Sequence, residues 1–257
     1  MADLTDAQWE RLAPTIPVVP RRSDGKGRPR VDNRAVLNGI LWVLCSGARW
    51  KDLPERYPPY QTCHRRFQEW IDQGVFERMA QDLAAVLPEQ DQIDLSECFI
   101  DGSFVEAKKG RQCRGRGKDG KGSTLMLIVD ANGLPIGVHV EAAHRHERTQ
   151  VQDTLVSVFT DEVPERLIGD KAYDSDGLDA DLAEQQIAMI APHRRNRKRK
   201  TQDGRPLRRA KRRWKVERAF AWLQNYRRLV VRYERYGVNV LGFVQLACVL
   251  ILLRQGF

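Results

Sequence analysis

The feature of the sequence that most limits the fold is a change of periodicity near residue 97. Before it, apolar residues recur at helical spacing, most clearly over residues 33–45. After it, three apolar segments have the length and flanking turn residues of β-strands: 97–105, 124–130 and 135–140. Asn132-Gly133, between the last two, is a typical hairpin turn. The sequence therefore predicts a helical region followed by antiparallel strands.

Beyond the hairpin, helical and extended segments alternate. We predict helices over 149–159 and 176–186, and short strands over 166–170 and 187–191. The chain is helical again from residue 213, with a break near Tyr236-Gly237. Antiparallel strands followed by alternating helix and strand indicate a mixed α/β sheet.

The first ninety residues are predicted to be helical. Thr5 has the position of an N-cap for a helix over 6–12. The turn Ser46-Gly47-Ala48 ends the helix over 33–45, and a helix over 62–73 follows a short segment at 50–53. This last helix places basic and amide side chains opposite its apolar face. The arrangement is typical of a helix-turn-helix, and an ordinary three-helix bundle explains it equally well.

Positive charge is concentrated in one segment of the chain. The net charge is +9 and the isoelectric point about 9.5. Residues 193–213, which we call the basic segment, hold twelve Lys or Arg and one Asp, so the remaining chain is close to neutral. Such a segment indicates a polyanionic partner, with nucleic acid first, although a targeting or solubilising charge run has the same composition.

The cysteines and the two ends of the chain indicate a cytoplasmic protein. Five scattered cysteines without a C-x-x-C pair argue against a disulfide framework or a zinc–cysteine site. The N-terminus is acidic and amphipathic, unlike a signal peptide. The apolar stretch 238–253 contains Asn239 and Gln245 and is short for a membrane span, so we expect a buried helix.

Two aspartates stand out in the predicted sheet. Asp101 lies inside the apolar run CFIDGSF, although Asp-Gly is also a hairpin-turn signal. Asp170 ends a short apolar strand in RLIGDKAYDS, where an acid is often only a turn or cap residue. Asp174 or Ser175 can cap the following helix, which leaves Asp170 without an obvious structural role.

Glu217 is a third candidate. In the predicted helix RRWKVERAFAWL, Trp214, Phe220 and Ala221 share its face by helical spacing. A carboxylate on an apolar stripe is costly unless it is paired or bound to a cation. Arg213, four residues earlier, is one possible partner, and a metal ion is the other.

The three acids together suit phosphodiester chemistry. Mg²⁺ prefers hard oxygen ligands, usually one or two carboxylates per ion. Two such ions stabilise the attacking and leaving oxygens of an in-line displacement. The basic segment, immediately before Glu217, would bring a DNA backbone to such a site, with an affinity that falls steeply with salt.

At this point the sequence resembles a known family, the bacterial insertion-sequence DDE transposases of the insertion-sequence-five-like branch. The resemblance runs from about residue 4 to residue 253. It is carried by LTDAQWERLAPTIP, GARWKDLPERY, FIDGSFVEAKKG, LIGDKAYDSDGL, RWKVERAFAWLQNYRRLVVRYER and the apolar tail.

The resemblance implies an RNase H-like catalytic domain with its triad at Asp101, Asp170 and Glu217. Members cut element ends and join the free 3′-hydroxyl to target DNA, usually with Mg²⁺. Related transposases carry a Tyr, Arg, Glu, Lys signature around the last acid. Arg213 keeps its Arg, but Ala210 and Gln224 stand at the Tyr and Lys positions, and Arg227 and Arg228 are expected to take over phosphate contacts.

Two further motifs have open interpretations. His144 and His146 suggest contacts to the active site or DNA rather than zinc, with Glu147 as an accessory acid. The loop 108–121 is basic and glycine-rich but lacks the spacing of a nucleotide-binding P-loop. We expect a DNA-contacting loop there, and a plain solvated loop explains the composition nearly as well.

We therefore predict a helical, helix-turn-helix-like DNA-binding region at 1–92 and an RNase H-like α/β catalytic domain at 93–257. The catalytic domain includes the basic segment and the C-terminal helices. Its expected cofactor is a pair of Mg²⁺ ions, for which Mn²⁺ can substitute. The predicted DNA contacts are His64, Arg65, Arg66, Lys108, Lys109, Arg194, Arg195, Arg197, Lys198, Arg199, Lys200, Arg208, Arg209, Arg213, Arg227 and Arg228.

The expected partners are the terminal inverted repeats of the element and target DNA, bound by a homodimer or larger assembly in the bacterial cytoplasm, at the nucleoid. Two other classes of protein share these features. One is a catalytically inactive DNA-binding protein or repressor. The other is a metal-dependent endonuclease that cuts without strand transfer.

Overall fold

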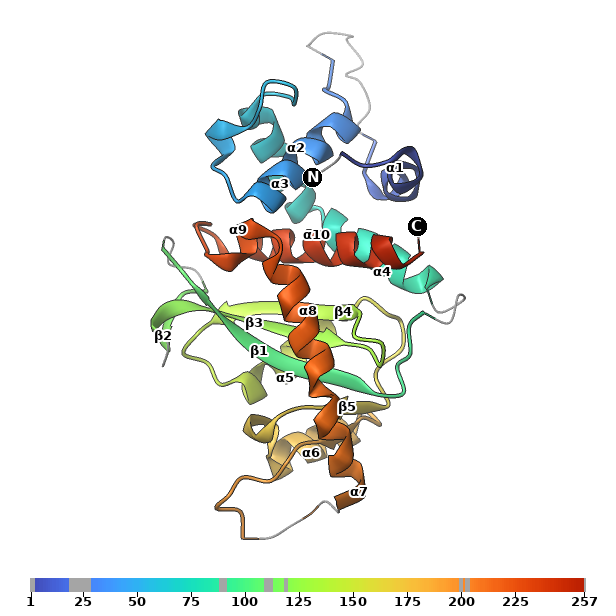
Figure 1. The fold of residues 1–257 in the computed structure, drawn as a ribbon, viewed down its shortest axis with the longest axis vertical. Helices are drawn as coiled ribbons and strands as arrows, with labels where there is room; N and C mark the ends of the chain where they lie inside the picture. The colour runs from blue at the N-terminus through green and yellow to red at the C-terminus, as the bar shows by residue number, and fades with distance from the viewer. Residues whose placement is uncertain are drawn as a thin grey trace.

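The structure is a computed structural model that describes residues 3–18, 29–87, 92–108, 113–117, 120–198, 201 and 204–256. From top to bottom in Figure 1, helices from the N-terminal part lie over a long C-terminal helix, and this helix lies over a β-sheet. The basic segment and its neighbours form the lower end of the molecule.

The N-terminal part is helical, as predicted. The helix α1 spans Asp6–Leu12, and Thr5 caps it in a capping box, accepting a hydrogen bond from the Gln8 N–H. The helix α2, Asn33–Ser46, ends at Gly47, whose φ of 69° suits glycine. A 3₁₀ turn follows, and then come α3, Tyr60–Asp72, and α4, Val75–Val86.

The sheet is mixed. Strands β1 (Cys98–Glu106), β3 (Gly120–Val129) and β4 (Pro135–Ala142) pair antiparallel. Strands β5 (Arg166–Ile168) and β6 (Ala188–Ile190) continue the sheet in parallel on the other side of β1. The order β4-β3-β1-β5-β6, with these directions, is that of an RNase H-like fold, which confirms the predicted fold class.

The hairpin and the strands were predictable, but one strand was not. Gly133, with φ of 88°, closes the turn between β3 and β4, as the Asn-Gly pair predicts. The short strand β2, Gly115–Gly117, lies inside the segment predicted as a loop. It pairs with residues 120–122, so part of this segment extends the sheet.

Helices cover both faces of the sheet. The helix α8, Trp214–Gln224, crosses in front of β1 and β3 in Figure 1, and its Lys215 ammonium lies over the Phe99 ring. On the other face, a 3₁₀ turn, η4 (Glu147–Gln150), leads into α5 (Val151–Val156). Helix α6 (Asp176–Ala183) packs beside β6, and α7 (Gly204–Leu207) with the 3₁₀ segment η6 (Arg208–Arg213) leads into α8.

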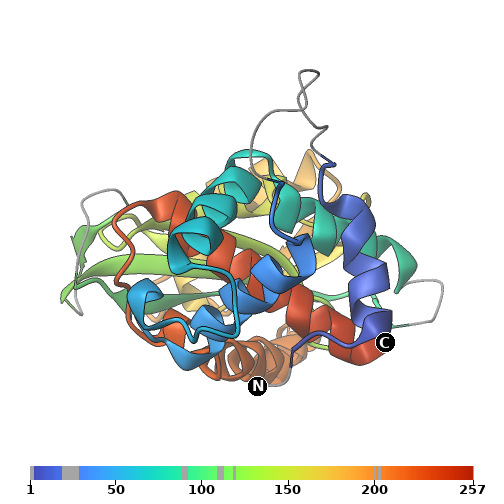
Figure 2. The same ribbon diagram turned by 90° about the horizontal axis from the view of Figure 1, so that it is seen from above.

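The C-terminal helix α10, Gly237–Gly256, joins the two parts of the molecule. It packs against α4 and α3 on one side and β4 on the other, and Figures 1 and 2 show it beneath the N-terminal helices. The helix is long and apolar enough to cross a membrane, but 78% of its most apolar window is buried inside the fold. It is therefore the buried core helix predicted for this stretch. Preceding it, α9 spans Arg227–Val230.

Candidate active site

The sheet places Asp101 and Asp170 side by side. β1 and β5 run parallel, with Phe99 opposite Ile168. Asp101 and Asp170 each follow two residues later, so both lie at the same level of the sheet, where β5 ends and β1 continues. The Asp-Gly pair at 101–102 lies within β1, so the alternative of a hairpin turn there is wrong.

Asp101 is paired with an arginine that lies 112 residues later in the chain. The Arg213 guanidinium, at the start of α8, donates to the Asp101 carboxylate at 2.9 Å. Burial raises the pKa of Asp101, and the Arg213 charge opposes this rise. Arg213 therefore partners Asp101, not Glu217 as its spacing of four residues suggested.

Asp170 has a structural role that the sequence concealed. Its carboxylate accepts a hydrogen bond from the Ala172 N–H at 2.6 Å and caps the 3₁₀ turn η5, Lys171–Tyr173. Ser175 caps α6, which is one of the two predicted alternatives. The inference that Asp170 lacks a structural role is wrong, because the short turn η5 needs a cap of its own.

A third carboxylate, that of Glu147, lies beside the two aspartates. A Cβ atom built on Gly102 would come within 2.8–2.9 Å of three Glu147 side-chain atoms, so Glu147 lies directly against the bare strand. Burial and, after it, the charges of Asp101 and Asp170 raise the pKa of Glu147 to about 7. The buried Tyr173 ring, delivered by η5, lies among the same three acids, and burial raises its pKa well above the usual value.

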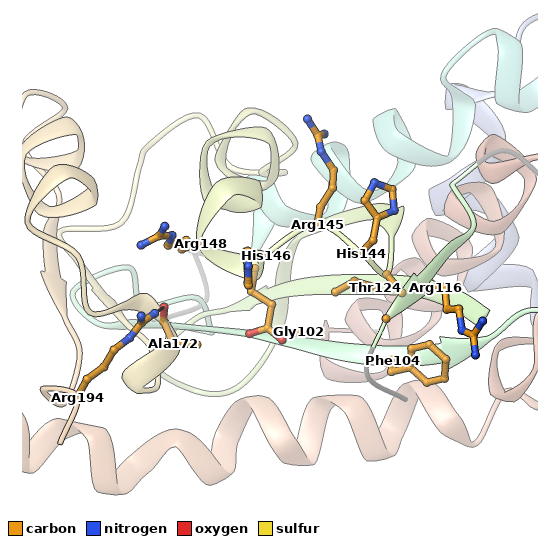
Figure 3. A pocket seen from close by; sticks show the side chains of 13 residues that line it. Gly102, Phe104, Arg116, Thr124, His144, Arg145, His146, Arg148, Ala172 and Arg194 are labelled. Atoms are coloured by element: carbon orange, nitrogen blue, oxygen red, sulfur yellow. Dashed lines mark hydrogen bonds between the residues drawn. The ribbon is translucent and has the colours of Figure 1, made fainter. Parts of the chain in front are cut away.

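Glu147 also lines a pocket of about 640 Å³, together with Gly102, Phe104 and Thr124 of the sheet. Asp101 and Asp170 adjoin this lining, since Gly102 follows Asp101 directly and Ala172 follows Asp170 two residues later. Figure 3 shows four arginines around the pocket: Arg116 from β2, Arg145 and Arg148 from the segment after β4, and Arg194 from the basic segment. Carboxylates beside a basic rim suit a phosphodiester backbone approached by cations.

The basic segment is tied at both ends to the elements that carry the acids. At its start, Asp174 accepts hydrogen bonds from the Arg194 N–H at 2.8 Å and from His193, and pairs with Arg197. The Arg194 guanidinium donates to the carbonyl of Ala172 at 2.9 Å. At the end of the segment, Arg209 and Arg212 pair with Glu97, just before β1. The described residues at both ends of the segment are thus fixed near the acids, and Arg194 lines the pocket.

Glu217 lies in the first turn of α8, one helical turn beyond Arg213. It is exposed, as are Trp214 and Ala221, and the buried stripe of α8 consists instead of Val216, Ala219, Phe220 and Leu223. The prediction that Glu217 sits on an apolar stripe is therefore wrong. Its role in catalysis stays a prediction.

Two of the predicted DNA contacts, Arg66 and Arg228, have buried side chains, and their contact with DNA stays a prediction. Arg66 is 3% exposed and donates to the Asn33 side chain, so it holds α3 to α2. Arg228 is 9% exposed and pairs with Glu234. Both were expected on the surface because a basic side chain is usually solvated, whereas here each side chain is buried and has a polar partner.

The other predicted contacts differ in accessibility. His64 is half-buried against the edge of Trp50. Arg197, Arg209 and Arg213 are engaged in the ion pairs described above, and Lys108 pairs with Glu106 at the surface. Lys109, Arg199 and Lys200 lie outside the described residues. The exposed candidates are Arg65, Arg194, Arg195, Lys198, Arg208 and Arg227.

Of the two signature positions that depart from the family pattern, Ala210 is partly buried in η6. Gln224 is the exposed last residue of α8.

The donor set at the site suits a hard divalent cation in its chemistry. Three carboxylates, those of Asp101, Asp170 and Glu147, gather around one buried hydroxyl, and Arg213 pairs with one of them. Within the described part of the chain, no three His, Cys, Asp or Glu side chains are close enough to hold a metal ion as they stand. The role of these carboxylates as metal ligands therefore stays a prediction.

An RNase H-like sheet with neighbouring aspartates beside a basic pocket defines a class of enzymes that cut or join nucleic acid strands. Comparison with known families identifies the branch. Residues 4–80 match the family described as "Putative transposase of IS4/5 family", and residues 93–252 match the "Transposase DDE domain". The chain belongs to the DDE transposases of bacterial insertion sequences, which are enzymes dependent on divalent metal ions.

Individual relatives agree with this assignment. The chain is 41% identical over 107 residues to an insertion element IS402 protein of Burkholderia cepacia, covering 40% of this chain and 73% of that one. It is 32% identical over 130 residues to a protein of Brucella ovis named "Putative transposase for insertion sequence element IS6501", covering 51% and 97%. Among solved structures, a piggyBac transposase complex matches with a TM-score of 0.40 and 12% identity, over 73% of this chain and 47% of that one.

Proposed function

We propose that the protein recognises the terminal inverted repeats of its own insertion sequence, hydrolyses the strand at each end and joins the exposed 3′-hydroxyl to target DNA. The observation that carries this proposal is the placement of Asp101 and Asp170 at one level of neighbouring parallel strands, beside a pocket rimmed by arginines. Two acids so placed can act on one phosphate, and the rim supplies the charge that holds its neighbours.

Asp101, Asp170 and Glu217 are the proposed ligands of two Mg²⁺ ions, with Mn²⁺ as a substitute. When bound, two such ions stabilise the attacking and leaving oxygens of phosphoryl transfer. Arg213 neutralises Asp101 in the present structure at 2.9 Å. When cations take over that role, the guanidinium becomes available to a DNA phosphate, since it sits at the edge of the site.

The exposed basic residues provide a path for DNA. Arg194, Arg195 and Lys198 follow β6, and Arg194 is hydrogen-bonded to Ala172 and Asp174 near Asp170. Arg208 is the first residue of η6, which ends at Arg213. Because Asp174 and Glu97 fix both ends of the basic segment, DNA bound along it passes the pocket. Arg65 on α3 is the remaining exposed candidate in the N-terminal region, where we propose that the inverted repeats are read.

Transposition needs two element ends in one complex. We therefore propose a homodimer or larger assembly on DNA, in the bacterial cytoplasm at the nucleoid. The proposal of an assembly follows from the reaction and not from any surface described above.

The test is a strand-transfer assay with purified protein, a labelled element end and a target plasmid, with Mg²⁺ or with chelator. The informative variant is Asp170→Asn, because the amide oxygen still accepts the Ala172 hydrogen bond and only the charge is lost. Asp181→Asn, an exposed acid on α6, is the matched control. We expect joined products with wild type and the control in Mg²⁺, and at least a hundredfold loss with Asp170→Asn.

Each other outcome favours a different class of protein. Cleaved but unjoined ends would indicate a metal-dependent endonuclease. Tight DNA binding without chemistry in Mg²⁺ or Mn²⁺ would indicate a repressor or an inactive copy. Undiminished joining by Asp170→Asn would refute the assignment of this residue.

A further inference from the structure

Glu147 is the one acid at the site that no motif of the triad includes. We propose that Glu147 is a fourth carboxylate of the catalytic centre and holds a divalent cation together with Asp101 and Asp170. This inference rests on the proposed function, since it adds a ligand to the same site. It follows from how Glu147 lies against β1, from what surrounds its carboxylate, and from its lack of a cationic partner.

The contact with β1 is close because Gly102 has no side chain. Gly102 follows Asp101 directly, and a Cβ there would be 2.8 Å from the Glu147 Cδ and 2.9 Å from its Cγ and Oε1. The Glu147 carboxylate therefore lies over the strand next to the residue that carries Asp101. Gly102 is extended within β1, so glycine is needed here for this approach and not for a turn.

A buried hydroxyl faces the same point. Tyr173 is 0% exposed, and its hydroxyl lies next to Glu147, Asp101 and Asp170, with no partner among the described residues apart from the Glu147 carboxylate. The turn η5 that Asp170 caps brings Tyr173 to this position. One buried hydroxyl cannot satisfy three neighbouring carboxylates, so this point is costly unless a further polar ligand, such as a hydrated cation, joins the site.

Glu147 differs from nearby glutamates in its lack of a basic partner. Glu141 pairs with Arg145 at 2.8 Å, and Glu97 with Arg209 and Arg212. For Glu147, no ion pair with a Lys or Arg exists among the residues that the structure describes. A partly buried carboxylate beside two others is unfavourable unless a cation binds, and hard oxygen ligands of this kind select a divalent ion such as Mg²⁺ or Mn²⁺.

The test measures binding of Mn²⁺ to the full chain without DNA, by titration of the free-ion EPR signal. The variants are Glu147→Gln, Asp170→Asn and, as matched control, Glu141→Gln. We expect Glu147→Gln to weaken Mn²⁺ binding at least tenfold and to slow end cleavage, with partial recovery at high Mn²⁺. Glu141→Gln should bind as wild type does. Circular dichroism and melting of each variant, measured without metal, show that it is folded.

A second readout locates the ion. Fe²⁺ with ascorbate and peroxide cuts a polypeptide near a bound ion, and we expect cuts around residues 101, 147 and 170 that Glu147→Gln suppresses.

If Glu147→Gln binds Mn²⁺ and cleaves DNA as wild type does, while Asp170→Asn loses both, the inference is overturned and the proposed function stands. If Asp170→Asn keeps wild-type Mn²⁺ binding, the proposed function itself fails.

Discussion

Arg228 and Arg227 are adjacent arginines that the structure separates into different roles. The Arg228 guanidinium is buried, donates to the Glu234 carboxylate at 2.8 Å from Nε and to the Ala48 carbonyl at 3.0 Å, and lies over the Phe243 ring. It therefore ties α9 to the turn after α2. Arg227 is exposed to solvent. We predict that Arg228→Ala destabilises the fold and that Arg227→Ala weakens DNA binding.

The magnitude follows from what Arg228→Ala leaves behind. The Glu234 side chain is 10% exposed, and without Arg228 its charge is buried and uncompensated. Breaking a buried pair in this way costs about 3–5 kcal/mol. Replacing both partners, Arg228→Met with Glu234→Leu, removes the isolated charge and should recover most of that loss. Arg227→Ala should change the free energy of unfolding by less than about 0.5 kcal/mol.

Urea unfolding followed by circular dichroism measures the stability of each variant, and fluorescence anisotropy against salt concentration measures DNA binding. Arg227→Ala should reduce the slope of log affinity against log salt by about 0.9 if it contacts one phosphate. The reasoning would be refuted if Arg228→Ala unfolded within 1 kcal/mol of wild type and weakened DNA binding as Arg227→Ala does.

Three further predictions concern single positions. Gly47→Ala should destabilise the fold by about 1–2 kcal/mol in urea unfolding, because φ is +69° and the new Cβ would be 2.9 Å from the Arg227 Cβ; unchanged stability would contradict this. Gly102→Ala should lower end cleavage at least tenfold with little change in melting temperature, since it displaces Glu147; wild-type cleavage would refute the close approach. Burial opposes ionisation of Asp174, but hydrogen bonds from Arg194 and His193 and the charge of Arg197 outweigh it and lower its pKa below the ordinary 3.8. Ionised Asp174 therefore stabilises the fold fully above pH 3.8, and this stabilisation is lost as the pH falls through the folded-state pKa. Asp174→Asn should flatten the acid limb of the curve of unfolding free energy against pH. An unchanged acid limb would count against this role.

Local signals in the sequence were sufficient for many elements. The capping residue Thr5, the hairpin pair at 132–133 and the apolar spacing of 33–45 each act within a few residues, and the structure follows them closely. The order of helices and strands was enough to predict the mixed sheet. The parallel pairing of β1 with β5, which brings Asp101 to Asp170, joins strands far apart in the chain, and only the structure shows it.

Contacts between distant segments were not predictable from the sequence. Arg213 pairs with Asp101 across more than a hundred residues, although Glu217 is only four residues away. The approach of Glu147 to Gly102 depends on how η4 packs on β1, which no spacing encodes. In the sequence, Arg66 and Arg228 resemble surface residues, because their partners Asn33 and Glu234 become apparent only once the helices pack together.

The central claim is that Asp170 binds a metal ion that strand transfer requires. The most direct measurement is strand transfer by Asp170→Cys in Mg²⁺ and in Mn²⁺, because a thiolate is a poor ligand for Mg²⁺ and a better one for the softer Mn²⁺. We predict joined products from the variant in Mn²⁺ only, whereas wild type joins DNA in both. Undiminished joining by Asp170→Cys in Mg²⁺ would contradict a ligand role for this residue.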